Sequence, residues 1–130
     1  MIKILENKDV FTKSTGMPYY DSFYYEDELE EYQLFKNTTF DIVPMSPNEY
    51  FEECANLQHT TVGNLKRLRE KHIDKIEKYI SDMENGDKFP MPVIDYMRKQ
   101  QEGLHRMYAV GELYGWDYEV PVMIVIKYKE

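Results

Sequence analysis

The stretch QQEGLHRMYAVGELYGWDYEVPVMIV, residues 100–125, passes from a polar turn through a helical segment into an apolar strand. Apolar side chains recur at helical spacing from Leu104 to Tyr114. The segment YEVPVMIVIKY, residues 118–128, is apolar on both sides in its middle, which is typical of a central strand covered by helices. This stretch therefore predicts a turn, a helix and a central strand in direct succession.

Two elements are predicted upstream, near the middle of the chain. TTFDIVPM, residues 38–45, has the composition and alternation of a strand. The next segment carries start signals for a helix, with Ser46 as N-cap, Pro47 at the first helical position and Glu49 three residues past the cap. Cys54 falls on the apolar stripe of that helix, so we interpret it as a small core residue and not as a nucleophile.

The longest periodic segment, residues 64–86, predicts one long helix that Asn64 caps and Asn85-Gly86 ends. His72 falls on its apolar stripe and is expected to be a packed histidine. The first turns hold a basic patch, which is either a solvated face or part of a phosphate pocket: Lys66, Arg67, Arg69 and Lys71. FPMPVIDYM, residues 89–97, predicts a strand bounded by prolines. The fold class is therefore α+β (mixed α/β), a small mixed sheet packed with helices.

Composition narrows the class of protein. The chain has 130 residues, one cysteine and a net charge of −8, which argues against broad binding of nucleic acid because phosphate contacts need a basic surface. A lone cysteine cannot form an internal disulfide and fits a reducing compartment. No apolar run reaches membrane-spanning length, and the first residues lack the pattern of a signal peptide. We therefore expect a cytoplasmic protein with no membrane partner.

Residues 1–37 form an acidic, tyrosine-rich extension, which we separate from a domain at residues 38–130. The segment YYEDELEEYQLF, residues 24–35, predicts a short acidic helix with one apolar edge. A solvated face is the plainer interpretation, and the alternative is a docking surface for a basic partner or a mimic of nucleic acid.

A candidate anion site lies where the polar turn meets the helix at Leu104. The first backbone N–H groups of a helix lack intrahelical partners, and the helix dipole adds partial positive charge there. Gly103 is expected to let a ligand approach this backbone, while Arg106 and His105 offer donors to phosphate oxygens. Glu102 is the candidate for holding a metal or activating water or a hydroxyl. The plain alternative is a solvated helix start, with His105 and Arg106 in solvent.

These residues also carry a resemblance. FPMPVIDY followed by QEGLHRMYAVGELYGWDYEVPVMIV resembles the core of the ParB/sulfiredoxin superfamily, in particular the Glu-Gly-x-His-Arg type found in small phage and bacterial ParB-like proteins. The resemblance covers about residues 38–128 and leaves the acidic extension unmatched. It implies a ParB/sulfiredoxin-like sheet for residues 38–130.

The resemblance also implies roles for residues. Gly103, His105 and Arg106, with Gln101 beside them, occupy positions similar to those that bind nucleotide phosphate in the family. Glu102 resembles the acidic residue that is catalytic or metal-linked in kinase-like members, and His105 is the second catalytic candidate.

Three further features refine the resemblance. Ala109 resembles the small residue that lets the helix pack closely on the sheet. Leu104 stands where sulfiredoxins have their reactive cysteine, which argues against sulfinic-acid reduction. His105 replaces an arginine of the CTP-hydrolysing partition proteins. We expect no counterpart within residues 1–130 of the helix-turn-helix region that those proteins use for specific DNA, which argues against a chromosome-partition role.

Three functions follow as hypotheses. The first is binding of ATP or CTP with Mg²⁺, followed by metal-dependent hydrolysis or phosphoryl transfer. The second is a metal-dependent nuclease that uses Glu102 and His105, which the negative net charge disfavours. The third is a non-catalytic, phage-type interaction protein that binds a host partner through residues 1–37.

Overall fold

The computed structural model of the protein describes residues 38–128 except 88, 90 and 97–98. This part of the chain contains four strands and four helices, which confirms the predicted α+β class. The elements in chain order are β1 (Thr38–Met45), α3 (Pro47–Leu57), α4 (Val62–Glu70), α5 (Ile73–Glu84), β2 (Val93–Asp95), β3 (Gln100–Glu102), α6 (Leu104–Tyr114) and β4 (Val120–Tyr128). The predictions for residues 1–37 lie outside the described residues.

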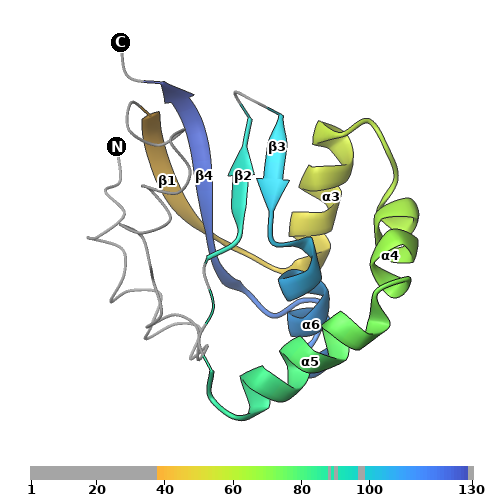
Figure 1. The fold of residues 1–130 in the computed structure, drawn as a ribbon. Helices are drawn as coiled ribbons and strands as arrows, with labels where there is room; N and C mark the ends of the chain where they lie inside the picture. The colour runs from red at the N-terminus through yellow and green to blue at the C-terminus, as the bar shows by residue number, and fades with distance from the viewer. Residues whose placement is uncertain (1–37, 88, 90, 97–98, 129–130) are drawn as a thin grey trace.

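The strands form one mixed sheet in the order β1-β4-β2-β3 (Figure 1). β4 pairs antiparallel with β1 and parallel with β2, and β2 pairs antiparallel with β3. The prediction that residues 118–128 hold a central strand is therefore confirmed. Helix α6 contacts α3, α4 and α5, so it lies at the centre of the helical layer.

The core lies between the sheet and this helical layer. Tyr50, Phe51 and Cys54 of α3 are fully buried there, as the predicted stripe requires. Ala109 of α6 is fully buried as well, which fits its expected role as a small packing residue. Burial raises the pKa of the Cys54 thiol to about 12, so this thiol stays protonated at neutral pH and is a poor nucleophile.

The start of α3 is the capping box that the sequence predicts. Glu49 N donates to Ser46 Oγ at 3.1 Å, and Ser46 N donates to Glu49 Oε1 at 3.1 Å. Pro47 occupies the first turn, where its missing N–H costs nothing.

The prediction that one long helix runs through residues 64–86, from the cap at Asn64 to the stop at Asn85-Gly86, is wrong. The chain forms two helices, α4 and α5, with the junction at Lys71 and His72. Thr61, and not Asn64, caps α4, because Asn64 N donates to the Thr61 hydroxyl at 3.0 Å. His72 is exposed at the N-cap of α5 and is not a packed core residue. The predicted stop at Asn85-Gly86 is confirmed, with Gly86 at φ 83°.

The polar turn before α6 also differs from the prediction. Gln100–Glu102 form the short edge strand β3, whose residues pair with Val93–Asp95. The buried Tyr50 hydroxyl lies 3.0 Å from both the Val93 and the Glu102 carbonyl oxygens, so α3 anchors both strands. The sequence lacks a strand pattern here because the segment is only three polar residues long and lies at the sheet edge.

Every helix in the described part of the chain is too short or too polar to cross a lipid bilayer.

Candidate functional site

Helix α6 begins directly after the edge strand β3, and Gly103 is the residue that makes the connection. Gly103 adopts φ +131°, a backbone conformation that residues other than glycine rarely adopt. A Cβ atom at this position would lie 2.9 Å from Pro92 Cβ and 3.0 Å from Pro92 Cα. The space beside Gly103 is thus filled by Pro92. The backbone turn and the close approach of Pro92 require the glycine, whereas the sequence alone predicts the close approach of a ligand.

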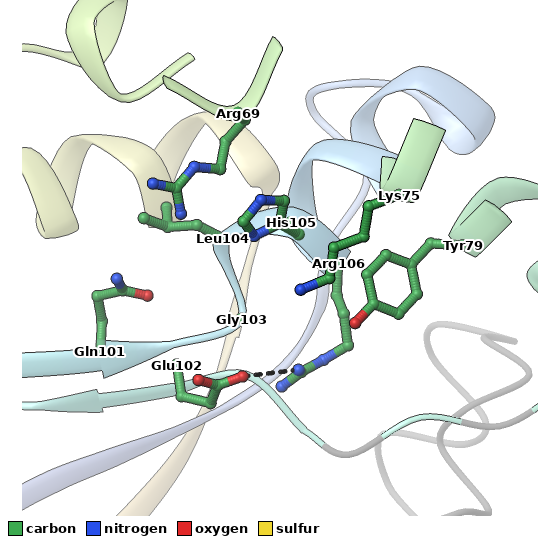
Figure 2. Close-up of a pocket in the computed structure, with 9 residues that line it drawn as sticks. All are labelled: Arg69, Lys75, Tyr79, Gln101, Glu102, Gly103, Leu104, His105 and Arg106. Atoms are coloured by element: carbon green, nitrogen blue, oxygen red, sulfur yellow. Dashed lines mark hydrogen bonds and ion pairs between the residues drawn. The ribbon is translucent and has the colours of Figure 1, made fainter. Parts of the chain in front are cut away.

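A cleft of about 270 Å³ opens in front of this helix start (Figure 2). It brings together side chains from β3, α4, α5 and α6. The lining residues are Arg69, Lys75, Tyr79, Gln101, Glu102, Gly103, Leu104, His105 and Arg106. All five residues that the sequence analysis assigned to the site therefore share one cleft, although their chemical roles stay predictions.

Arg106 is buried and does not point into bulk solvent as the plain alternative expected. Its side chain is 7% exposed, and Nη1 donates to Glu102 Oε1 at 3.0 Å, while Nη2 lies 3.5 Å from the Met91 carbonyl oxygen. The Glu102 side chain is 48% exposed, so the ion pair has one buried and one accessible member. Arg106 is held in place at the floor of the cleft by a carboxylate that solvent can reach.

Arg69 and Lys75 add two cations to the cleft beyond the five residues predicted from the sequence. Arg69 belongs to the predicted basic patch, and its α4 position turns it toward the cleft (Figure 2). Neither side chain has a hydrogen-bond or ion-pair partner among the described residues, and Arg69 Nε is buried without one. Leaving the partly buried guanidinium of Arg69 without a partner is costly, so an anion in the cleft would be favourable to it, while the exposed Lys75 would add its charge from the rim.

The net charge of the residues that line the cleft is opposite in sign to the net charge of the whole chain. Arg69, Lys75 and Arg106 supply three positive charges against the single negative charge of Glu102, a net charge of plus two on the lining residues. The whole chain carries −8. Desolvation lowers the pKa of Arg69 from its ordinary value, although a guanidinium remains charged at neutral pH. The cleft is a local cationic site on an acidic protein.

His105 is neutral in this environment. Desolvation, followed by the nearby charges of Arg69, Lys75 and His72, lowers its pKa from 6.5 to about 4. Its ring stacks on that of His72 with centroids 5.2 Å apart, and His105 Nε2 lies 3.0 Å from His72 Nδ1. One imidazole therefore donates to the other, and His105 serves as a neutral hydrogen-bonding group and not as a fourth cation.

Gln101 and Tyr79 complete the walls. Gln101 Oε1 is buried without a hydrogen-bond partner within the described residues. The ring of Tyr79 lies edge-to-face on Phe89 with centroids 5.4 Å apart, so its orientation is set by packing. The sequence could not identify Tyr79 or Lys75, because both depend on where the separate helix α5 lies relative to α6.

The residues present do not fit a resident divalent metal. Glu102 is the sole carboxylate among the described lining residues, and it is already paired with Arg106. The described part of the chain has no group of three or more His, Cys, Asp or Glu side chains able to hold a metal ion. A Mg²⁺ ion would have to enter this cleft already bound to the phosphates of a nucleotide.

Comparison with known proteins gives no matching family model, no matching curated protein and no matching solved structure.

Proposed function

We propose that this protein binds the phosphate groups of a nucleotide in the cleft before α6. One observation carries this proposal: Arg69 and Lys75 converge on the cleft without any partner among the described residues. Arginine offers a planar fork that matches phosphate oxygens, and lysine offers a compact charge. The sequence resemblance to the ParB/sulfiredoxin superfamily supports the same ligand.

The backbone adds to this cationic set. The first intrahelical bond of α6 runs from Met107 N to Gly103 O at 2.9 Å, so the amides of the three preceding residues have no partner within the helix. No side chain caps this helix start. The positive end of the helix dipole and the cations of the cleft would act on the same anion.

Hydrolysis of the bound nucleotide is the activity that Glu102 would serve. A phosphate that took over Nη1 of Arg106 would release the Glu102 carboxylate at the rim, where it is accessible to water. Water would then attack the terminal phosphorus and lose a proton to Glu102, while the bond from that phosphorus to the bridging oxygen breaks and the shortened nucleotide leaves.

The other two hypotheses have less support. A cleft of about 270 Å³ suits a small ligand better than a nucleic-acid strand, and the net charge of −8 disfavours the nuclease. Binding of a protein partner through residues 1–37 concerns a segment outside the described residues.

Calorimetric titration tests the binding proposal. We expect ATP, CTP or GTP, with or without Mg²⁺, to bind with measurable affinity and to raise the melting temperature as ligand concentration rises. Inorganic tripolyphosphate tests the phosphate contacts alone, and sodium chloride at matched ionic strength is the control. The proposal is wrong if no phosphate compound stabilises the protein more than the chloride control does.

A further inference from the structure

A second cavity adjoins the phosphate cleft. Its volume is about 390 Å³, and it shares two wall residues, Lys75 and His105, with the first cavity. The other lining residues come from the junction between α4 and α5: Lys71, His72, Ile73 and Asp74. The side chains of Lys75 and His105 are thus the boundary between two adjoining spaces.

The second cavity offers surfaces for a flat, uncharged group. Ile73 is 45% exposed although it is a large hydrophobic residue at the start of α5. His72 and His105 lie beside it as a stacked pair with an interplanar angle of 29°. Aliphatic and imidazole surfaces of this kind suit the face of a heterocyclic ring.

Asp74 gives this cavity a charge pattern unlike that of the phosphate cleft. It is exposed in the first turn of α5 and has no hydrogen-bond or ion-pair partner in the described part of the chain. Its carboxylate can accept hydrogen bonds from hydroxyl or amino groups. Lys71 and Lys75 also line the cavity, so the lining residues carry a net charge of plus one, against plus two in the phosphate cleft. The second cavity therefore adds, beside its cations, a carboxylate that can accept from a group with hydrogen-bond donors.

The two volumes agree with one ligand that occupies both spaces. Small-molecule pockets measure roughly 300–1,000 Å³, so the phosphate cleft alone falls below that range and the second cavity lies near its lower end. We propose that the second cavity holds the nucleoside of a nucleotide whose phosphates lie in the first cleft, with Ile73 against the ring and Asp74 accepting from ribose hydroxyls or base amino groups. This inference rests on the proposed function.

Titration of the intact protein with nucleotides and with inorganic tripolyphosphate separates the two cavities. We expect at least one of ATP, CTP, GTP and UTP to bind about tenfold more tightly than tripolyphosphate. Ile73→Ser and Asp74→Ala should each remove most of that difference, while the affinity for tripolyphosphate stays the same or, for Asp74→Ala, rises. Leu68→Ser, at a position 37% exposed outside both cavities, is the matched control and should change neither affinity.

The outcomes distinguish this inference from the proposed function. Equal affinity of the wild-type protein for tripolyphosphate and for all four nucleotides would overturn the inference and leave phosphate binding intact. Equal weakening of both ligand types by Ile73→Ser would also overturn it. Failure of every phosphate compound to bind would overturn the proposed function and the inference with it.

Discussion

Arg106 Nη1 lies 3.0 Å from Glu102 Oε1, which joins the first turn of α6 to the last residue of β3. The pair resolves a conflict in the sequence, where a carboxylate stands next to residues that suit phosphate. The carboxylate neutralises a buried guanidinium when no anion is bound, and it is accessible enough to leave. Glu102 is thus a natural competitor of the proposed ligand.

Replacing the partnerless cations should weaken phosphate binding. We expect Arg69→Gln and Lys75→Gln each to lower the affinity for tripolyphosphate about tenfold or more, because each removes a charged hydrogen-bond donor. The matched controls are Arg67→Gln in α4, where Arg67 bonds Asn64, and Lys78→Gln in α5, where Lys78 pairs with Asp82. Calorimetry measures the affinity of all four variants for tripolyphosphate. An equal loss of affinity in targets and controls would contradict the prediction, because it would show that only the net charge of the protein matters.

Removing the competing carboxylate should have the opposite effect on binding. Glu102→Gln raises the net charge of the cleft by one and removes the carboxylate that pairs with Arg106 Nη1, so we expect the affinity for tripolyphosphate to rise about threefold to tenfold. The same variant should lose any nucleotide hydrolysis, measured as phosphate release. Glu77→Gln, on the exposed surface of α5 outside the cleft, is the control. Weaker binding by Glu102→Gln would contradict the competition.

The titration of His105 reports the charge of the cleft. We expect His105 to titrate near pH 4 by NMR, because it is desolvated and faces Arg69, Lys75 and His72, with Glu102 as the opposing charge. Arg69→Gln or bound tripolyphosphate should raise this pKa. A value near 6.5 in the unliganded protein would mean that the cleft is more solvated than the structure indicates.

The same shift makes stability depend on pH. The unfolded chain binds a proton at His105 below about pH 6.5, whereas the folded chain binds it only near pH 4. The contribution of His105 to the free energy of unfolding is therefore full above pH 6.5 and is lost as the pH falls toward 4. Urea titrations across this window should show a smaller loss for His105→Gln than for the wild type.

Gly103 should tolerate no side chain. Gly103→Ala places a Cβ against Pro92 at a φ of +131°, and the backbone strain alone should cost about 1–3 kcal/mol of stability. Gly63→Ala is the matched control, because a Cβ there meets nothing within 4 Å and Gly63 lies in α4. We expect its effect to stay within about 1 kcal/mol, in the stabilising direction. Similar urea midpoints for the two variants would refute this account of Gly103.

Local signals predicted the parts of the fold that local chemistry controls. The cap at Ser46, the helix from Leu104 and the apolar strand at 120–128 each follow from side chains near one another in the chain. The sequence does not predict the break at His72. The helical spacing of apolar residues continues across residues 71 and 72, whereas the helix ends at Glu70 and a second helix begins at Ile73. Periodicity records which faces are apolar, and it does not show where the backbone turns.

The candidate site was predicted only along its contiguous segment. Gln101 to Arg106 could be identified because they are neighbours in sequence, whereas Lys75 and Tyr79 enter the cleft from α5 through tertiary packing. Glu102 and Arg106 form an ion pair four residues apart. The sequence alone does not indicate this pair, because a carboxylate beside phosphate-binding residues also suits a metal or a water molecule.

The placement of β4 has a consequence for synthesis. β4 lies between β1 and β2 although it is the last described element. Neither neighbour therefore has a hydrogen-bonding partner along its inner edge until residues 120–128 have been made. On the ribosome, the helices can form early, whereas the sheet must wait for its middle strand to emerge from the exit tunnel. A nascent chain stalled before residue 120 would therefore present unpaired strand edges to chaperones.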